Sequence, residues 1–478
     1  MSWLWGMLFF LGLFNWMLQI SGYRLLHHAI LAVYLGSYFG FFGIGLSLIS
    51  KRYGVTTGLL VAPFLWVSLE FVRGNLSFLA LPWALLAHSQ YQYLPIIQFA
   101  SFTGAYGISF LIVMVNAALT AIILKFFSPL QKLKLANSRP PSRKAVISLL
   151  ATTAALTGLA LFYGQITLSR PIAGEGIKVS VVQANIEQKK KWDKHYANDI
   201  IEIYTDLTRR ASEERPMLIV WPESATPGSI SRYPRLKAKV THVAREAAAC
   251  LLLGSSQYHK FRNEKSRLLL KYTNSAYLIR PDSKMATTQR YDKIRLLPFT
   301  EYLPLKGIFP WSYLKVLNIR GYLPGKEFTV FEFPPYRFST TICWENIFPD
   351  VFRQFVKRGA QFMINITNEA RFGNTSAPYH FLPMSVLRAV ENRVFVIRCA
   401  NTGVSCFIDP FGRIVDRVRD TNGEDIFVQG TLTGTVIPLK TNTFYTRHGE
   451  WLVWLSILVS AVFLGMAFLR KNPSIPSR

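Results

Sequence analysis

The sequence lacks the signatures of several common enzyme classes. It contains no Gly-x-Ser-x-Gly elbow and no glycine-rich phosphate loop, which argues against a serine hydrolase and against a nucleotide-binding enzyme. Zinc-finger spacings and aromatic, glycine-rich RNA-binding motifs are also missing, so we expect no nucleic-acid partner. No metal site and no cofactor are expected either.

Cysteine is scarce as well. The chain has four cysteines, and their spacing fits neither a disulfide framework nor a zinc site. Cys250, Cys399 and Cys406 lie in apolar, β-like runs that are typical of a protein core. A cross-strand disulfide between Cys399 and Cys406 stays open at this point. Cys343 differs from the other three because it stands between a β-like run and an expected helix start.

Acidic side chains are half as frequent as basic ones. The chain has 54 Lys and Arg against 27 Asp and Glu, which gives a formal net charge of +27. Because no nucleic-acid motif is present, anionic lipid is the partner that this excess favours. We interpret basic clusters such as 189–191 and 260–267 as a solvated face. The alternative is attraction to lipid head groups, worth about 1 kcal/mol per residue near a charged surface.

Long apolar runs, in contrast, are abundant. Half of the residues are hydrophobic and the mean hydropathy is +0.22, which is too apolar for an ordinary soluble enzyme. A signal peptide is the alternative for the first run, but no basic segment precedes it and no small-residue cleavage site follows it. Six runs approach the length of about 20 residues that spans a bilayer, namely Trp3 to Ile20, Ile30 to Ser50, Val55 to Val72, Thr103 to Leu124, Ala145 to Tyr163 and Trp451 to Leu469.

The stretch from Leu76 to Ala100 is only partly apolar. It contains Pro82 and Pro95, so we interpret it as a loop with an interfacial or re-entrant piece and not as a seventh span. Glu70 and Arg73 precede it, near the end of a run, and are expected at the membrane interface.

Basic residues orient the runs. Lys51 and Arg52 follow the second run, six basic residues between positions 125 and 144 follow the fourth, and three follow the sixth. The alternate short loops carry only Arg24 and Arg73. The positive-inside rule therefore predicts that both termini are cytoplasmic and that residues from about 168 to 447 lie on the other side.

Between positions 168 and 447, β-like runs alternate with helical patterns, which indicates one α/β domain with helices covering a largely buried sheet. Helices are expected at Trp192 to Glu214, Leu236 to Ala249, Val351 to Arg358 and Phe381 to Asn392. Strands are expected at Ile177 to Ala184, Met217 to Trp221, Cys250 to Tyr258, Lys271 to Ile279, Ala286 to Tyr291, Phe328 to Phe333, Tyr336 to Ile342, Gln361 to Thr367, Val394 to Ala400, Val404 to Ile408 and Phe427 to Leu432.

Three strand ends in this segment carry residues capable of chemistry. Glu223 follows an apolar strand, where low dielectric favours a role as a base. Lys293 and Glu301 border one proline-bearing loop, and Cys343 ends a strand. Each residue alone has an ordinary explanation: a surface carboxylate at a turn, a solvated lysine, a small buried thiol. A Cys–His site is disfavoured, because the one well-placed histidine, His380, has no signature around it.

Taken in order, the motifs WPES, YDKIRLLPFTEYLP and TTICWE resemble the carbon–nitrogen hydrolase, or nitrilase, superfamily. Residues 1 to about 470 resemble its membrane-bound branch, the bacterial apolipoprotein N-acyltransferases. Further similarities are the VVQANI strand at 181–186 with a tryptophan after it, the stretch 368–373, and the stretch 401–414.

The resemblance implies a membrane protein with three parts. These are an α-helical transmembrane bundle of about five helices in 1–167, a periplasmic α/β domain in 168–447, and a C-terminal transmembrane helix with a cytoplasmic tail in 448–478. The α/β domain is expected to be a four-layer αββα sandwich. The implied setting is the bacterial inner membrane, with the chain acting as a monomer.

The resemblance also assigns roles to residues. Glu223 is the general base, Lys293 stabilises the oxyanion and Cys343 is the nucleophile. Other positions match supporting or substrate-binding residues of the family, namely Trp192, Glu301, Trp344, Glu345, Asn368 and Arg371.

The implied reaction moves a fatty acyl chain in two covalent steps. The Cys343 thiolate attacks a phospholipid ester and forms a thioester. The α-amino group of a lipoprotein's N-terminal diacylglyceryl-cysteine then takes the acyl chain. Two lipid substrates would explain why a nitrilase-like domain is held at a bilayer.

The sequence departs from the family in three places. One pair of N-terminal helices is missing relative to the usual family pattern, which preserves the topology parity. Trp344 stands where a tyrosine is common, and Arg371 stands where the family has a tryptophan. The arginine puts acyl-chain contact or acceptor choice in doubt, and it suggests contact with a lipid phosphate.

Two other functions stay open. The first is a membrane-tethered amidase or nitrilase that uses water as the acceptor. The second is a transporter-like or scaffold protein with a degenerate outer domain. Against the latter, all three catalytic positions are intact, and the apolar runs lack the charges that mark ion or substrate paths.

Overall fold

The computed structural model describes residues 1–126, 140–262, 268–282, 288–305, 308 and 321–469. They divide into two compact units. The helical unit comprises Met1–Arg170 and His448–Arg478, and the sandwich unit comprises Pro171–Arg447.

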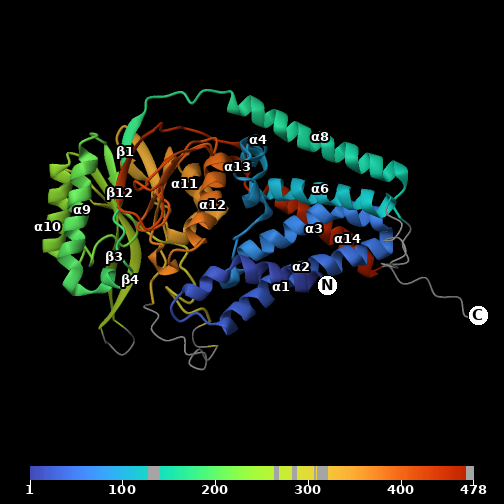
Figure 1. Ribbon diagram of the computed structural model, residues 1–478, viewed down its shortest axis with the longest axis horizontal. Coiled ribbons are helices and arrows are strands. Elements are labelled where there is room, and N and C mark those ends of the chain that lie inside the picture. Colours follow the sequence, from blue (N-terminus) through green and yellow to red (C-terminus); the bar gives the residue numbers. More distant parts are fainter. Residues whose placement is uncertain (127–139, 263–267, 283–287, 306–307, 309–320, 470–478) are drawn as a thin grey trace, which may run out of the picture. The chain divides into compact units, whose positions relative to one another are not determined.

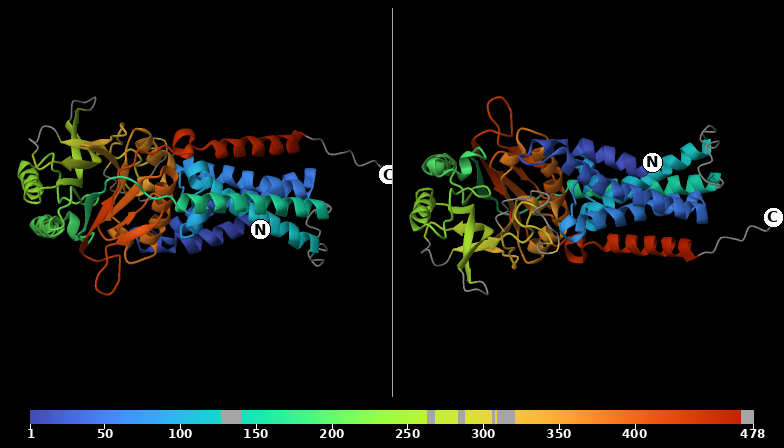
Figure 2. Two further views of the ribbon diagram at one scale, coloured as in Figure 1. Left: turned by 90° about the horizontal axis from the view of Figure 1, so that it is seen from above. Right: turned by 90° about the horizontal axis from the view of Figure 1, so that it is seen from below.

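Within its described residues, the helical unit has five helices that are long and apolar enough to cross a membrane. One of them, red in Figure 2, joins the others from the far end of the chain: the hydroxyl oxygens of Ser68 and Ser460 are 3.2 Å apart although 392 positions separate them. The five are α2 (Leu25–Tyr53), α3 (Val55–Asn75), α6 (Ala105–Phe126), α8 (Arg143–Leu168) and α14 (Trp451–Leu469).

The expectation of a sixth span over 3–20 is wrong. Helix α1 (Ser2–Leu13) has 12 residues, about 18 Å of helix, and a 3-10 turn, η1 (Asn15–Gln19), follows it. The chain leaves the helix here because the rings of Phe14 and Trp16 turn inward to pack on Trp83, with centroids 5.9 and 5.7 Å from it. Phe10, Phe14 and Trp16 of this run are buried within the unit, whereas Trp5 and Leu8 are exposed.

The stretch after α3 forms no long helix, as predicted. It holds short elements only, namely η2 (Ser77–Leu79), η3 (Leu86–Gln90), α4 (Leu94–Ile97) and α5 (Ala100–Thr103). Glu70 and Arg73, near the end of α3, are buried against this stretch, 3% and 4% exposed. Arg73 Nη1 donates to the Trp83 carbonyl at 2.7 Å, and the Leu86 N–H donates to Glu70 Oε1 at 2.8 Å. Irregular backbone at membrane depth needs such partners.

The sandwich unit contains two sheets of six strands each in its described residues. In spatial order, the first sheet is β12 (Gly430–Val436), β1 (Ile177–Gln183), β2 (Leu218–Val220), β3 (Cys250–Arg262), β4 (Leu268–Ile279) and β5 (Gln289–Asp292). The second sheet is β11 (Ile414–Arg417), β10 (Cys406–Ile408), β9 (Phe395–Ala400), β8 (Phe362–Thr367), β7 (Tyr336–Ile342) and β6 (Phe331–Phe333).

Each sheet has a parallel centre and antiparallel edges. Strands β1, β2 and β3 are parallel in the first sheet, and β7, β8 and β9 are parallel in the second. Parallel strands are usually buried on both faces, which explains their continuous apolar runs. Their carboxyl ends share one edge, where α/β proteins commonly place their ligands.

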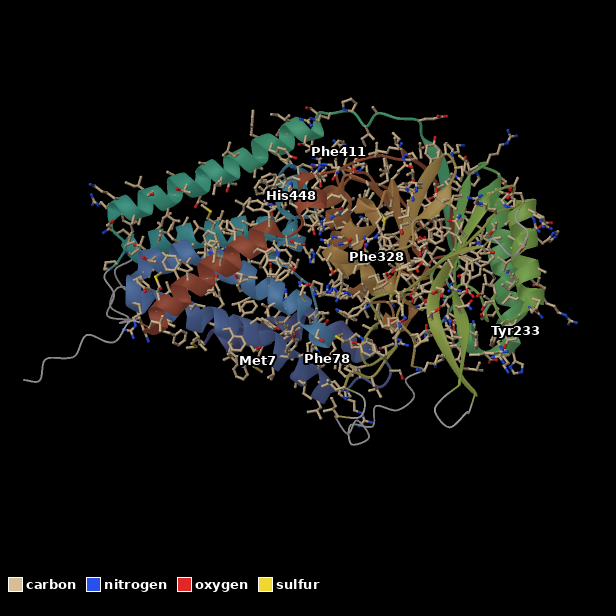
Figure 3. The ribbon with its side chains drawn as sticks, turned by 180° about the vertical axis from the view of Figure 1, so that it is seen from behind. Met7, Phe78, Tyr233, Phe328, Phe411 and His448 are labelled. Carbon is tan, nitrogen blue, oxygen red and sulfur yellow. The ribbon has the colours of Figure 1, made fainter. Side chains whose placement is uncertain are left out.

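Helices cover the outer face of each sheet. Figure 1 shows α9 (Ala197–Ser212) and α10 (Pro234–Glu246) against the first sheet, and α11 (Pro349–Lys357) and α12 (Ala377–Asn392) against the second. Tyr204 of α9 stacks on Trp221 at 4.6 Å between ring centroids. On the other side, the ring of Phe328, labelled in Figure 3, lies 5.2 Å from that of Phe355 in α11.

The two sheets pack face to face. The Cys399 thiol of β9 lies 3.2 Å from the Val220 carbonyl oxygen of β2, so the strands that carry them are in contact. The layers are therefore helix, sheet, sheet and helix, which confirms the four-layer sandwich. Cys399 and Cys406 are both free, so the disulfide left open above is not formed.

Several elements and boundaries differ from the sequence prediction. Strand β11 was not expected, and α9 begins at Ala197 because the residues before it form two 3-10 turns, η4 (Lys190–Trp192) and η5 (Lys194–Tyr196). Strand β12 begins three residues later than predicted, since Phe427 has a positive φ of 55°. A short helix, α13 (Phe444–His448), precedes α14.

Candidate active site

Cys343 has a backbone conformation that residues with a side chain rarely adopt. It follows β7, and its φ is +58°, in the left-handed region. Backbone contacts hold this conformation: Asn365 Nδ2 donates to the Cys343 carbonyl at 3.1 Å, and the Ile342 N–H donates to Glu345 Oε2 at 2.9 Å. A strained backbone conformation that hydrogen bonds hold in place is typical of a site where the direction of the side chain matters.

The surroundings of Cys343 favour the protonated thiol. Burial raises its pKa above the ordinary value, the Glu223 carboxylate raises it further, and Lys293 opposes both. A buried thiol with a raised pKa is not a ready nucleophile. It needs a base to take its proton, and the same electrostatic interactions show that the carboxylate of Glu223 is near it.

Glu223 follows β2, and both of its carboxylate oxygens are held. Asn274 Nδ2 donates to Oε1 at 2.7 Å, and the Asn368 N–H donates to Oε2 at 2.9 Å. The turn after β2 lies directly on β3: a Cβ at Gly254 would come within 2.7 Å of the Glu223 Cα and 2.6 Å of the Ser224 nitrogen. Only glycine at 254 allows the backbone to approach this closely.

Lys293 follows β5 and is almost completely buried, 1% exposed. Its Nζ lies 3.0 and 2.9 Å from the two carboxylate oxygens of Glu301. Asn274 Nδ2 also donates to Glu301 Oε1, at 3.1 Å, so one amide bridges Glu223 and Glu301. The Leu297 N–H donates to Glu301 Oε2 at 2.7 Å and fixes this second carboxylate.

The ammonium of Lys293 is permanent. Burial alone would lower its pKa, but the acidic groups near it, Glu301 foremost, outweigh burial and raise it above the ordinary value. Lys293 is therefore a fixed positive charge near the thiol. A fixed, desolvated cation of this kind can stabilise an oxyanion.

Glu345 and Trp344 connect the turn that begins at Cys343 to the loop that carries Lys293. Glu345 Oε1 accepts hydrogen bonds from Tyr291 Oη at 2.8 Å and from the N–H groups of Ile294 and Arg295 at 2.7 and 2.9 Å. Trp344 Nε1 donates to the Arg295 carbonyl at 2.6 Å. Burial raises the pKa of Glu345, although Lys293 and the backbone donors oppose it. Both side chains align Lys293 with Cys343 through the segment between them.

Trp192 and Arg371 are more exposed than the other predicted site residues. Trp192 ends η4 and is 42% exposed, and Arg371 is exposed on η9 (Ala370–Phe372). Each is near a residue that holds Glu223, Trp192 beside Lys191 and Arg371 three residues after Asn368. The Asn368 side chain itself accepts a hydrogen bond from Asn401 Nδ2 at 3.0 Å.

Besides Lys191, four polar residues that support the site were not predicted from the sequence. Asn274 is one, and the others form a buried chain behind Cys343. Arg398 Nη2 donates to Glu369 Oε1 at 2.7 Å and its Nη1 donates to Asn365 Oδ1 at 3.0 Å, and Asn365 holds the Cys343 carbonyl. Burial raises the pKa of Glu369 to about 7, and Arg398 opposes this shift. The one signal available was a polar residue within an apolar strand, as in Thr273-Asn274-Ser275 of β4.

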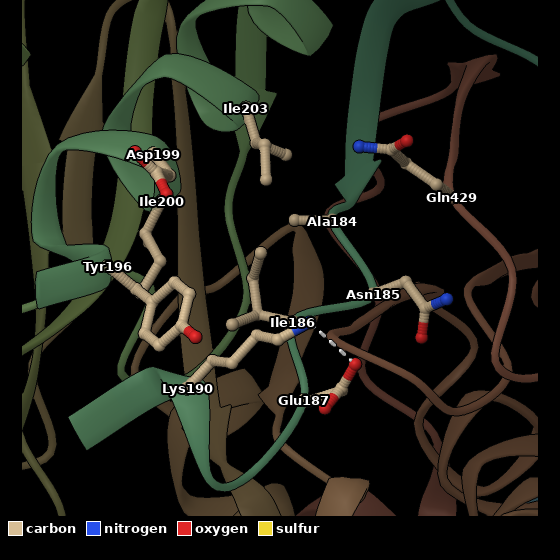
Figure 4. Close-up of a pocket in the computed structure, with 10 residues that line it drawn as sticks. All are labelled: Ala184, Asn185, Ile186, Glu187, Lys190, Tyr196, Asp199, Ile200, Ile203 and Gln429. Atoms are coloured by element: carbon tan, nitrogen blue, oxygen red, sulfur yellow. Dashed lines mark hydrogen bonds and ion pairs between the residues drawn. The ribbon is translucent and has the colours of Figure 1, made fainter. Parts of the chain in front are cut away.

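A separate cavity of about 310 Å³ lies beside η4 (Figure 4). Its apolar floor comes from Ala184, Ile186, Ile200 and Ile203, and the ion pair of Lys190 with Glu187 lies at its rim. None of the predicted site residues lines this cavity. Among the described residues, no three His, Cys, Asp or Glu side chains gather as metal ligands.

The arrangement can therefore perform nucleophilic catalysis: a thiol, a buried carboxylate and a fixed ammonium meet at the carboxyl ends of strands from two packed sheets. Residues 178–437 match the carbon-nitrogen hydrolase family, and residues 1–118 match the apolipoprotein N-acyltransferase N-terminal domain. The fold and the match to 178–437 define an enzyme of the carbon–nitrogen hydrolase superfamily.

Relatives narrow the class. The apolipoprotein N-acyltransferase of Geobacter metallireducens is 37% identical over 86% of this chain and 74% of its own length. That of Pasteurella multocida is 27% identical over 99% and 88%, and that of Chlorobaculum tepidum is 29% identical over 88% and 79%. The chain belongs to the apolipoprotein N-acyltransferase family and is a multi-pass membrane acyltransferase.

Solved structures of an amidase from Nesterenkonia AN1, a member of the nitrilase superfamily, are also similar. A mutant of this amidase is 17% identical, with a TM-score of 0.41, and the match covers 58% of this chain and 95% of the amidase. A double mutant in complex with acrylamide is 16% identical, with a TM-score of 0.41, over 59% and 96%.

Proposed function

We propose that this chain transfers a fatty acyl group from a phospholipid to the α-amino group of the N-terminal diacylglyceryl-cysteine of lipoproteins, through a thioester on Cys343. The observation that carries the proposal is the position of Cys343 on a left-handed turn, within electrostatic reach of Glu223 and Lys293. The family relationship supports the choice of substrates.

In the first step, Glu223 takes the Cys343 proton as the sulfur attacks the carbonyl carbon of a phospholipid ester. The Lys293 ammonium and the N–H of Trp344 stabilise the oxyanion. The ester C–O bond breaks, Glu223 returns the proton to the leaving oxygen, and a lysophospholipid departs. The acyl group stays on the sulfur as a thioester.

In the second step, the α-amine of the acceptor attacks the thioester carbonyl while Glu223 accepts a proton from the nitrogen. The C–S bond breaks, the amide is released, and the thiolate recovers the proton from Glu223. The amide of Asn274 donates to Glu223 and so keeps it oriented in both steps. The same amide donates to Glu301, the partner of Lys293.

A position at the bacterial inner membrane with the sandwich unit in the periplasm fits this chemistry, because both substrates are lipids. Basic residues at the ends of α2 and α6, namely Lys51, Arg52 and Lys125, support a cytoplasmic location for those helix ends. One chain supplies Glu223, Lys293 and Cys343, so a monomer suffices. We place the domain limits at about residues 167 and 447, with the C-terminal tail in the cytoplasm.

A two-substrate assay tests the proposal. The detergent-solubilised full chain is incubated with a phospholipid labelled in one acyl chain and a synthetic diacylglyceryl-cysteinyl peptide. We expect labelled N-acyl peptide and parallel double-reciprocal plots, as a covalent intermediate requires. Release of labelled free fatty acid without N-acyl peptide would instead indicate a membrane-tethered hydrolase.

A further inference from the structure

Of the three consecutive lysines at 189–191, one is buried. Lys189 and Lys190 are exposed, and Lys190 pairs with Glu187 at 2.8 Å. Lys191 is 3% exposed, and its Nζ donates a hydrogen bond of 3.0 Å to the backbone carbonyl of Glu223. Burying an ammonium is costly, so a lysine in such a place has a structural or functional use.

We propose that Lys191 is the positioning residue for Glu223: its ammonium fixes the peptide group that carries Glu223 and adds a positive charge beside this base. This inference rests on the role of Glu223 as the base. In this proposal Lys191 acts through Glu223 and not by contact with the substrate or the sulfur.

The need for such an anchor follows from the turn after β2. Ser224 has a φ of +50°, so the backbone leaves Glu223 in a conformation that residues with a side chain rarely adopt. Asn274 and Asn368 hold the two carboxylate oxygens, and Lys191 holds the backbone carbonyl. The base is thus fixed at three points by three different segments, β4, the β8 end and the turn after β1.

Several charged or titratable groups surround Lys191 and Glu223. Glu223 is the charge that acts on Lys191, and the ion pair of Lys190 and Glu187 lies on the same turn. Three residues at other strand ends interact electrostatically with Glu223. They are Lys293 after β5, Cys343 after β7 and Glu369 after β8.

A pH dependence follows. Burial lowers the pKa of Lys191 to about 8, although Glu223 opposes the shift. Lys293 keeps its proton in this range because its pKa is raised. The acylation step should therefore slow above about pH 8, where Lys191 loses its charge.

The effect on stability has the opposite sign. The folded pKa of Lys191 lies below its ordinary value of 10.5, so between about pH 8 and 10.5 the unfolded chain binds more protons than the folded chain. The contribution of Lys191 to stability consequently rises with pH through this window. A loss of rate above pH 8 without a loss of melting temperature is thus the signature of the positioning role.

The test measures single-turnover acylation of the full chain by phospholipid between pH 6 and 9.5, beside the melting temperature. Three variants are compared: Lys191→Met, Lys191→Arg and, as a matched control on the surface, Lys189→Met. We expect Lys191→Met to be slower by about 10-fold to 100-fold at pH 7 and to lack the decline above pH 8. Lys191→Arg should regain part of the rate and stay flat through pH 9, because a guanidinium keeps its charge. Lys189→Met should match the native chain.

Two results would overturn the inference: a native rate that does not decline above pH 8, or a Lys191→Met profile that matches Lys189→Met. If the native chain forms no acyl adduct, the proposed function fails, and alkylation of Cys343 by iodoacetamide at pH 7, located by peptide mapping, replaces acylation as the readout. Slower alkylation in Lys191→Met than in Lys189→Met then supports the positioning role, and equal alkylation contradicts it.

Discussion

The two sheets of the sandwich unit hold their parts of the site in different ways. The first sheet supplies Glu223 and Lys293, and side-chain contacts through Asn274 and Glu301 hold both. The second sheet supplies Cys343, which is held through its backbone, by a left-handed φ and a hydrogen bond from Asn365 to its carbonyl. The charged groups are fixed by partners, and the nucleophile is fixed by conformation.

The difference follows from the chemistry each group must perform. A base and an oxyanion donor need stable charges in a buried place, and charges there require partners. A thiol that must become a nucleophile needs its sulfur free, so only its backbone can be held. Variants in the first sheet should therefore change charge-dependent rates, whereas variants in the second sheet should change the placement of the sulfur.

The largest effect in this comparison is expected for Glu223→Gln. The amide keeps the size of the side chain but cannot take the Cys343 proton, so the acylation rate should fall by about 10² to 10⁴-fold. Single-turnover acylation by phospholipid measures this. Asn274→Asp, which keeps the size of the bridging side chain, is the companion variant and should lose less. A Glu223→Gln rate within a few-fold of native would remove Glu223 from the mechanism.

Lys293→Met should reduce both rate and stability. Loss of the oxyanion donor costs about 10² to 10³-fold in rate, and leaving Glu301 buried without its partner costs about 3–5 kcal/mol of unfolding free energy. The double variant Lys293→Met with Glu301→Gln should recover much of the stability and none of the rate. Thermal unfolding and single-turnover kinetics separate the two effects, and a double variant with restored rate would argue against the role of Lys293.

Asn365→Ala tests the second sheet. It removes the donor to the Cys343 carbonyl, and the unsatisfied carbonyl should cost about 1–3 kcal/mol of unfolding free energy. The acylation rate should fall by about 10-fold, because the sulfur is less well placed. Ser385→Ala is the matched control, since Ser385 accepts from Arg398, which also donates to Asn365, but does not contact Cys343. Equal rates in the two variants would contradict the idea that the backbone of Cys343 is held for catalysis.

The smallest effect is expected for Arg371→Trp. Arg371 belongs neither to the contacts described for Glu223 and Lys293 nor to those described for Cys343. We propose that the exposed guanidinium contacts a lipid phosphate, as charge-assisted pairs of this kind do. The variant should keep the rate with one phospholipid within a few-fold but change the preference among phospholipids with different head-group charge. Competition between two labelled phospholipids measures the preference. An unchanged preference would exclude this contact.

Strand patterns could be predicted from the sequence because buried parallel strands leave continuous apolar runs. The predicted strand over Tyr336 to Ile342 coincides with β7, and Glu223 and Lys293 follow strands as expected. The predicted pair of strands before Lys293 is the antiparallel pair β4 and β5. The lengths of the apolar runs also indicated the five long apolar helices of the described residues.

The supporting residues could not be predicted, since they depend on contacts between segments that lie far apart in the chain. Lys191 is one of three consecutive lysines, and nothing local separates it from its exposed neighbours. Arg398 acts across the second sheet on Asn365. The contacts of Glu70 and Arg73 could not be predicted for the same reason, because their partners are backbone groups of an irregular segment ten and sixteen residues away.

The most direct measurement is intact-protein mass spectrometry of the purified chain after incubation with phospholipid alone, beside Cys343→Ala. The account predicts a gain of one fatty acyl mass that hydroxylamine removes, that Cys343→Ala lacks, and that a diacylglyceryl-cysteinyl peptide discharges as N-acyl peptide. A folded native chain that gains no acyl mass, or an adduct that persists in Cys343→Ala, would contradict the thioester on which the account depends.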